Sequence, residues 1–281
     1  MPLDQTSPAS TRPTALPRAE GALALTTKSA RRAGGMSTLP DTLRTSGCLR
    51  ALFPRHPSRC EAIVINTSGG LTGGDRLSLS AHAGAGTHLT LTSQAAERAY
   101  RASSGEARVT TRLSAAPGAC LQWLPQELIL FNGAALSRRL TVELEPGARA
   151  LIVEPVVFGR PAMGETVTQA HLFDRIHINR CGAPLFRDAS RLSGNIAAQL
   201  AHPAVGNGAG AMAALIYVNS DAEAHLGPIR AALPKTAGAS LLAPDTLVAR
   251  FLAEDAFALR QTLLPVLDRL SGSTLPTSWR L

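Results

Sequence analysis

Residues 77–92 read LSLSAHAGAGTHLTLT, and this stretch gives the clearest indication of the fold. Apolar and polar residues alternate over Leu77–Ala83 and again over His88–Thr92, which is the period of a half-buried β-strand. Gly84 and Gly86 lie between the two runs and permit the positive φ angles of a tight turn. We therefore predict two strands joined as an antiparallel hairpin.

Similar alternation continues on both sides of this stretch. Further runs of this kind are Ala62–Ile65, Arg108–Leu113, Leu121–Leu124, Leu128–Phe131, Leu140–Leu144, Ala150–Val153 and Thr166–Ile178. Turn dipeptides begin at Pro117, Asn132 and Pro146, at intervals of 15 and 14 residues, which is typical of successive antiparallel strands. Because no helical pattern separates the runs, a doubly wound parallel sheet is not expected.

Helical spacing begins only after about residue 206. Strands are predicted over Ala213–Val218 and Leu247–Leu252. A helix over Asp221–Leu233 should be broken or kinked at Gly227-Pro228. A second helix should begin at Asp255, stop at Gly272 and bend at Pro265.

The sequence thus predicts a mainly β fold, a single β-rich domain of many antiparallel or mixed strands with one or two C-terminal α-helices. We expect a disordered tail over residues 1–18 and the domain over residues 19–281, with a strand and helix subregion from about residue 206 to 281. The Arg-, Ser- and Thr-rich start has no apolar signal core; a transit peptide is the alternative interpretation of this tail.

The composition of the chain excludes some classes of protein and limits the kinds of partner. Hydrophobic residues make up 45% and charged residues 17% of 281 residues, which excludes a disordered chain. No apolar run is long enough to cross a membrane. The net charge of +8 permits a nucleic-acid or an acidic protein partner. Because the basic residues are scattered and not interleaved with aromatic ones, nucleic-acid binding remains the weaker alternative. Four separated cysteines indicate a reduced, intracellular protein.

Catalytic motifs are missing from the sequence. There is no G-x-S-x-G or H-E-x-x-H motif. The spacing from Gly69 to Gly74 resembles a phosphate-binding loop, but Asp75 follows where a lysine is needed and would repel phosphate. Two histidine groups could touch a metal, yet exposed strand positions explain them more simply; they are His82 with His88, and His171 with His177 and Cys181.

Two loops carry the densest local signals. The first, Asn66–Leu77, reads NTSGGLTGGDRL, and the second, Phe158–Glu165, reads FGRPAMGE. Each is either a tight connection that needs glycine or a surface that a partner approaches closely. An enzyme that uses the first loop with Asp75, such as a hydrolase, is the alternative.

These loops, in this order, resemble the UreD (UreH) family of urease accessory proteins. Ser68–Leu77 resembles the glycine-rich signature of that family, and Thr92–Arg101 is similar to its T-T-Q-A-A-T-K-V-Y-R segment. Leu124–Ala134 resembles its L-P-x-P-x-I-x-F-x-G-A stretch, Gly159–Glu165 its G-R-x-A-x-G-E motif, and Leu275–Arg280 its closing P-R-x-W. The sequence departs from these patterns at Ser93, Glu97, Arg98 and Thr277, and the changes at Glu97 and Thr277 alter charge.

The resemblance implies a cytoplasmic scaffold and not an enzyme, with UreF, the GTPase UreG and apo-urease as partners and no membrane or nucleic acid. It implies no tightly bound cofactor but a possible passage for nickel, whose candidate ligands are Asp75, Glu127, Glu154 and Glu165. The positions expected to bind partners or to maintain the motifs are Gly69, Gly70, Gly73, Gly74, Asp75, Arg76, Tyr100, Gly159, Arg160, Gly164 and Trp279.

Overall fold

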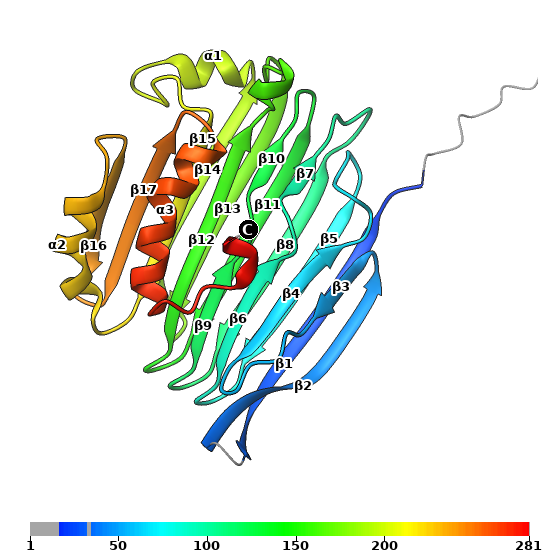
Figure 1. The fold of residues 1–281 in the computed structure, drawn as a ribbon. Helices are drawn as coiled ribbons and strands as arrows, with labels where there is room; N and C mark the ends of the chain where they lie inside the picture. The colour runs from blue at the N-terminus through cyan, green and yellow to red at the C-terminus, as the bar shows by residue number, and fades with distance from the viewer. Residues whose placement is uncertain (1–16, 33–34, 281) are drawn as a thin grey trace, which may run out of the picture.

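Two β-sheets face each other, and in its middle part the chain passes back and forth between them (Figure 1). The computed structural model describes residues 17–32 and 35–280. The seven-stranded sheet has, in spatial order, β14 (Ala183–Gly194), β13 (Ala170–Arg180), β11 (Ala135–Leu144), β8 (Ala107–Ala115), β5 (Arg76–Ala83), β1 (Glu20–Arg32) and β2 (Gly35–Gly47).

The second sheet is ten-stranded. Its main path is β16 (Ala237–Ala243), β17 (Thr246–Ala253), β15 (Ala211–Val218), β12 (Arg149–Phe158), β9 (Cys120–Leu124), β6 (His88–Ser93), β4 (Cys60–Asn66) and β3 (Leu49–Leu52). Two short strands, β10 (Leu128–Leu130) and β7 (Glu97–Ala99), extend it from β12.

The predicted hairpin over residues 77–92 is wrong. Both strands exist, but β5 belongs to the seven-stranded sheet and β6 to the ten-stranded sheet, so Gly84–Gly86 forms a corner between sheets. Pro117-Gly118 and Pro146-Gly147 form the equivalent corners in the next two layers. The corners stack, because Gly86 N–H donates to the carbonyl of Pro117 at 3.2 Å and Gly118 N–H to that of Pro146 at 3.4 Å.

This path explains why the expected succession of antiparallel strands is also wrong. Each interval of 14 or 15 residues follows one sheet only: β9 and β10 lie in the ten-stranded sheet between Pro117 and Asn132, and β11 lies in the seven-stranded sheet between Asn132 and Pro146. The chain therefore returns to each sheet in the same direction, and neighbours such as β5, β8 and β11 run parallel. A strand of the opposite sheet replaces the helix that usually connects parallel strands. Antiparallel pairs occur at the margins, for example β1 with β2 and β13 with β14, so the mixed, mainly β fold class is confirmed.

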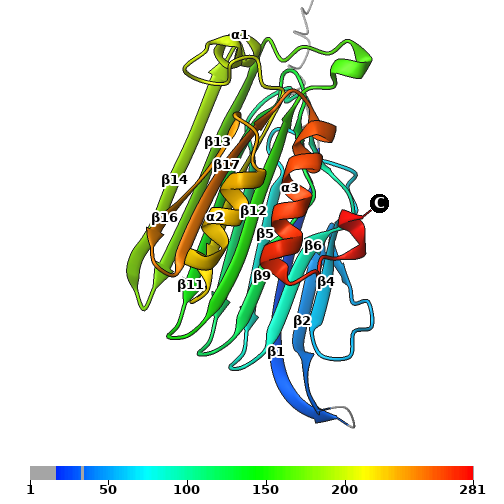
Figure 2. The same ribbon diagram turned by 60° about the vertical axis from the view of Figure 1, so that its left-hand side comes forward.

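The alternating pattern correctly predicts which side chains face the core. Along β5, Leu77, Leu79 and Ala81 are buried between the sheets, whereas Ser78 and Ser80 face outward. A second core lies on the outer face of the ten-stranded sheet, beneath the helices α2 (Ala222–Ala232) and α3 (Ala256–Ser271) (Figure 2). Strand β12 is buried almost throughout, because core packs against both of its faces.

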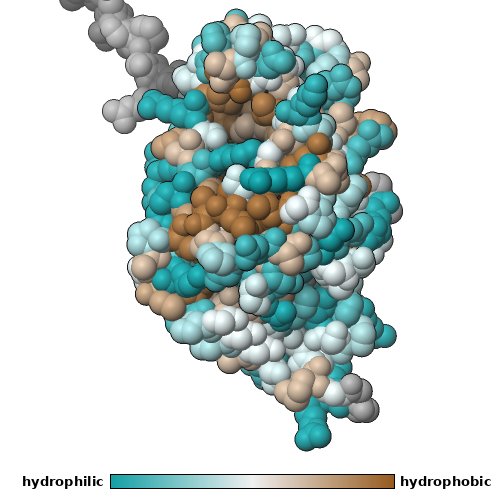
Figure 3. Space-filling view, turned by 90° about the vertical axis from the view of Figure 1, so that its left-hand side faces the viewer, coloured by the Kyte–Doolittle hydropathy of each residue, from teal (hydrophilic) through white to brown (hydrophobic). Residues whose placement is uncertain are grey.

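The side of the molecule that carries β14, β16 and α2 shows apolar surface between bands of polar side chains (Figure 3). Two ion pairs join the sheets near this edge: Arg250 with Asp188, and Arg180 with Asp245 at 2.9 Å. Polar contacts therefore close an edge that lacks a covering strand.

The C-terminal helices follow the sequence signals closely. Asp255 caps α3 by accepting a hydrogen bond from Ala258 N–H at 2.8 Å, and Gly272, with φ of +64°, ends it. Neither Pro228 nor Pro265 ends its helix, so the expected break in α2 is wrong. A short helix, α1 (Ile196–Ala201), was not predicted. No helix among residues 17–32 and 35–280 has the length and hydropathy needed to span a membrane.

The described residues form one β-rich domain. Most of the predicted tail lies outside them, since the description starts at Pro17.

Candidate functional site

The glycine-rich loop connects β4 to β5 at one end of the two sheets. Leu71 N–H donates to the carbonyl of Arg98, and Tyr100 N–H donates to the carbonyl of Leu71, both at 2.7 Å. Gly70 has φ of +145°, and a Cβ there would lie 2.4 Å from the ring of Tyr100. A Cβ on Gly73 would lie 2.3 Å from the carbonyl oxygen of Ser104. These glycines are therefore required by close backbone packing.

Asp75 holds this loop against the first strand. Its side chain is buried; Oδ1 accepts a hydrogen bond from Ala19 N–H at 2.8 Å and Oδ2 accepts one from Thr72 N–H at 2.7 Å. Because both oxygens are occupied by backbone donors, the geometry gives no support to Asp75 as a nucleophile, a base or a nickel ligand. The adjacent Arg76 starts β5 and is exposed.

The second motif lies at the same end of the molecule. Glu165 accepts a hydrogen bond from Arg160 Nε at 2.9 Å and one from Asn132 N–H at 3.2 Å. The Arg160 guanidinium lies 4.2 Å from the ring centroid of Phe131, and Tyr100 meets that ring edge-on at 4.9 Å. The two motifs are therefore brought together through Tyr100, Phe131 and Arg160.

We call this region the loop end and define it as residues 66–75, 100–106, 131–134 and 159–169. Gly69, Gly74, Gly159 and Gly164 occupy turns within it. Two of its apolar side chains are exposed, Tyr100 by 37% and Met163 by 74%. The loop end thus combines a rigid backbone with apolar and cationic side chains at the surface, which suits protein contact.

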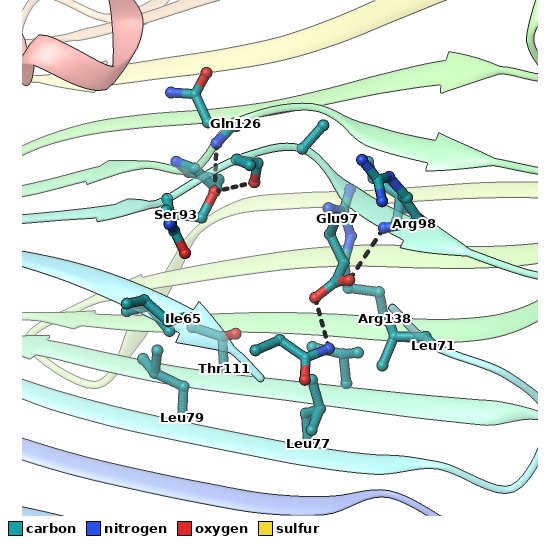
Figure 4. A pocket seen from close by; sticks show the side chains of 18 of the residues that line it. Ile65, Leu71, Leu77, Leu79, Ser93, Glu97, Arg98, Thr111, Gln126 and Arg138 are labelled. Atoms are coloured by element: carbon teal, nitrogen blue, oxygen red, sulfur yellow. Dashed lines mark hydrogen bonds between the residues drawn. The ribbon is translucent and has the colours of Figure 1, made fainter. Parts of the chain in front are cut away.

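A cavity of about 250 Å³ opens beside the glycine-rich loop and extends between the sheets (Figure 4). Asn66, Gly69, Glu97 and Arg98 line one part of it, and the inward-facing side chains of β5, β8 and β11 line another. Glu97 accepts a hydrogen bond from Asn66 Nδ2 at 3.1 Å, and burial raises the pKa of Glu97. An acid therefore lies in the cavity wall where the family pattern has a threonine.

A cluster of three charged side chains, Arg138, Glu154 and Asp174, lies deeper in the molecule. Arg138 and Glu154 line the cavity. Arg138 Nε donates to Asp174 Oδ1 at 3.0 Å, and Arg138 Nη1 lies 2.7 Å from Glu154 Oε2 on the facing sheet. Trp123 Nε1 donates to Glu154 Oε1 at 2.7 Å. Both oxygens of Glu154 are therefore engaged, Oε1 by Trp123 and Oε2 by the guanidinium of Arg138.

Burial raises the pKa of Glu154 to about 7, and attraction to Arg138 offsets the rise only in part. The carboxyl group therefore titrates near neutral pH inside an otherwise largely apolar space. It can hold a proton or, when ionised, pair with the guanidinium of Arg138.

The structure does not bring the four candidate nickel ligands together. Only Glu154 lines the cavity; Asp75 and Glu165 are engaged in the loop end, and Glu127 accepts from Arg260 Nη1 at 2.9 Å on the other face of the ten-stranded sheet. Within residues 17–32 and 35–280, no three or more Asp, Glu, His or Cys side chains are grouped to hold a metal, the two histidine groups included.

Sequence reasoning missed Arg138 and Asp174. Both residues could have been found as charged residues at inward-facing positions of alternating strands. Arg138 lies between the inward Leu136 and Leu140, and Asp174 lies on the same face of its strand as the buried Ile176. Such residues have to be paired to be buried. Trp279 is structural, since it is fully buried and donates from Nε1 to the carbonyl of Leu124 at 2.9 Å.

Comparison with known proteins assigns the family. The model of the UreD urease accessory protein family matches residues 19–280. The chain belongs to the UreD family. It is 53% identical to the urease accessory protein UreD of Ruegeria pomeroyi over 88% of this chain and 97% of that protein. It is 48% identical to the UreD of Roseobacter denitrificans over 94% of this chain and 96% of that protein. Membership in the UreD family supports a role in urease maturation.

Proposed function

We propose that this UreD-family chain is a non-catalytic, cytoplasmic scaffold that binds UreF and, with it, the GTPase UreG, docks on apo-urease and helps nickel reach the active site of urease. The family match over residues 19–280 carries this proposal. The engaged carboxylate of Asp75 agrees with it, because the loop that most resembles a catalytic element is fixed by structural hydrogen bonds.

The cavity supports a passage for nickel as cargo. Two carboxylates, Glu97 and Glu154, line it, and Glu154 is paired there with Arg138. Carboxylate oxygens are hard ligands that hold a borderline cation more weakly than imidazole or thiolate does. Because the Glu154 carboxylate is already paired with Arg138, it suits brief contact with a cation and release rather than storage, so no tightly bound cofactor is proposed.

The loop end is the proposed surface for UreF. It presents Tyr100 and Met163 on a backbone fixed by Gly70 and Gly73, and Arg160 lies beside them. Exposed aromatic, methionine and arginine side chains on a rigid support are frequent at protein interfaces. Asn66, Gly69 and Leu71 of the loop end line the cavity, so a partner bound there would lie beside the passage.

The direct test is co-expression of the urease subunits and the accessory proteins with and without this chain, followed by measurement of nickel per urease and of urease activity. We expect both to fall when the chain is omitted. Equal nickel content in the two samples would refute the proposal. Capture of UreF on the tagged chain, compared between wild type and Met163→Asp, tests the loop end separately.

A further inference from the structure

The outer face of the seven-stranded sheet is uncovered and strongly basic. Helices α2 and α3 pack on the ten-stranded sheet, and neither covers this face (Figures 1 and 2). The side chains that point outward from its strands include eight arginines, Arg44, Arg76, Arg108, Arg112, Arg139, Arg175, Arg187 and Arg191. We call these eight residues the arginine face.

The strand register arranges the arginine face in three neighbouring rows. One row holds Arg44, Arg112 and Arg187, the next holds Arg139 and Arg175, and the third holds Arg76, Arg108 and Arg191. Seven strands about 4.8 Å apart give a width of about 29 Å, and rows two residues apart give a height of about 13 Å. The charges that seem scattered in the sequence are therefore gathered on one plane.

Most of these cations lack an acidic partner. Among the described residues, only Arg108 forms an ion pair, with Glu106 at 3.2 Å. Two acidic side chains, Glu20 and Glu143, point outward from strands in or beside these rows. Glu143 accepts a hydrogen bond from Asn179. Many other carboxylates of the chain are engaged elsewhere, for example Glu154, Asp174 and Glu127. The arginine face therefore carries a clear excess of positive charge.

The titration of His177 agrees with a positive local potential. His177 lies in the first row, next to Arg187. Partial burial lowers the pKa of His177, and the positive charges of Arg187, Arg139 and Arg175 lower it further. No carboxylate opposes them in that balance.

We propose that the arginine face docks an acidic protein surface within the urease maturation assembly, an inference that rests on the proposed function and extends it to a second interface. Charge complementarity identifies the occupant, since a flat cluster of arginines without paired acids attracts carboxylates. Arginine forms two parallel hydrogen bonds with a carboxylate, which gives orientation as well as attraction.

A protein fits this face better than a nucleic acid. Sheets that bind single strands present aromatic rings on which bases stack. Here the outward aromatic residue among the rows is Phe173, which is half-buried and lies under the Arg175 guanidinium at 4.3 Å. The other outward residues between the arginines are mostly small, such as Ala24, Ser78 and Ser80, so a broad protein surface can approach the backbone closely.

The test uses three exposed arginines that make no side-chain hydrogen bond or ion pair among the described residues. The full tagged chain is co-expressed with the urease subunits, UreF and UreG, as wild type and as the triple variant Arg112→Glu, Arg139→Glu and Arg191→Glu. A matched control carries the same change in charge on other surfaces, Arg55→Glu, Lys235→Glu and Arg269→Glu. A triple lysine variant at the first three positions keeps the charge and reports on folding.

Affinity of each purified chain is measured for poly-L-glutamate and for a 20-base-pair DNA duplex, and captured urease proteins are quantified at 50 and 300 mM NaCl. We expect the triple glutamate variant to bind poly-L-glutamate and the acidic assembly partner about ten- to a hundredfold more weakly than wild type. The control should bind within about twofold of wild type. The lysine variant should bind less tightly than wild type but more tightly than the glutamate variant, because it keeps the charge and lacks the paired hydrogen bonds of arginine. Higher salt should weaken wild type more than the glutamate variant.

Equal affinity of wild type and the glutamate variant for poly-L-glutamate would overturn the proposal, as would a glutamate variant that captures all assembly partners at wild-type levels. Tighter binding of the duplex than of poly-L-glutamate, lost in the glutamate variant, would make the face a nucleic-acid surface and also overturn it. If wild type captures neither UreF nor urease, the proposed function fails, and the docking proposal in the urease assembly fails with it. If the glutamate variant does not fold, Arg→Gln changes at the same three positions replace it.

Discussion

Replacement of Glu154 by glutamine should remove a pH-dependent cost to folding. In the unfolded chain the carboxyl has a pKa of 4.5, whereas burial raises the folded-state pKa to about 7. Between these values the folded state holds a proton that the unfolded state has lost. Wild-type stability therefore falls, through this group, as the pH rises from about 4.5 to about 7, and the loss is complete above pH 7.

The size of this effect follows from the shift. One pKa unit corresponds to about 1.4 kcal/mol, so ionisation of Glu154 lowers the free energy of unfolding by up to about 3 kcal/mol. The figure needs no correction for solvent exposure, because Glu154 is buried and contacts Trp123 and Arg138. Glutamine preserves the shape and cannot ionise, and Arg138 keeps its pairing with Asp174.

The measurement is urea unfolding of wild type and Glu154→Gln at pH 5, 6, 7 and 8, followed by tryptophan fluorescence. We expect the variant to gain stability relative to wild type as the pH rises, by about 2.5 kcal/mol between pH 5 and pH 8. Glu254→Gln, a change at an exposed acid, serves as the control and should follow wild type at every pH. Parallel pH profiles for wild type and Glu154→Gln would refute the account of the buried cluster.

Three further predictions concern stability and the loop end. Trp279→Ala removes a fully buried ring and should lower the free energy of unfolding by about 3–5 kcal/mol in urea titration, whereas Trp279→Phe should cost clearly less. Glu127→Gln weakens the contact of Arg260 with the ten-stranded sheet, which spans 2.9 Å, and should cost about 2–3 kcal/mol, with hydrogen exchange increased in α3; unchanged exchange would contradict this. Gly73→Ala places a Cβ 2.3 Å from the carbonyl oxygen of Ser104, so it should reduce UreF capture at least tenfold. Wild-type capture by Gly73→Ala would show that the loop geometry is not needed for binding.

The sequence was sufficient for the class of fold and for the side-chain pattern, but not for the strand pairing. Alternation fixes which residues of β5 and β6 face inward, and it does so whether the next strand lies beside the first or opposite it. Gly84–Gly86 permits either a hairpin or a corner between sheets. The stacked hydrogen bonds between successive corners, such as Gly86 to Pro117, favour the corner, and they depend on residues about 30 positions apart.

In the candidate site, too, local features could be predicted from the sequence and contacts between distant segments could not. The glycine-rich loop and the Gly159–Glu165 motif were found because their signals are local. Their association through Phe131 was not predicted, since the partners come from distant turns. Glu154 was selected as an acid, but its pairing with Arg138 and Asp174 depends on the register of strands in two facing sheets. The arginine face was missed for that reason too: its rows exist only after seven strands are aligned.

The most direct test of the proposed passage compares two substitutions of threonine by phenylalanine. Thr111 lines the cavity, so Thr111→Phe fills the interior. Thr236 is exposed next to β16, away from the loop end and the arginine face, so Thr236→Phe serves as the matched control. Nickel per urease is measured after co-expression of each variant with the urease subunits and accessory proteins, together with the amount of UreF captured. The account predicts that Thr111→Phe retains UreF but delivers little nickel, while Thr236→Phe delivers the wild-type amount. Full nickel content with a Thr111→Phe chain that still binds UreF would contradict a route through the cavity.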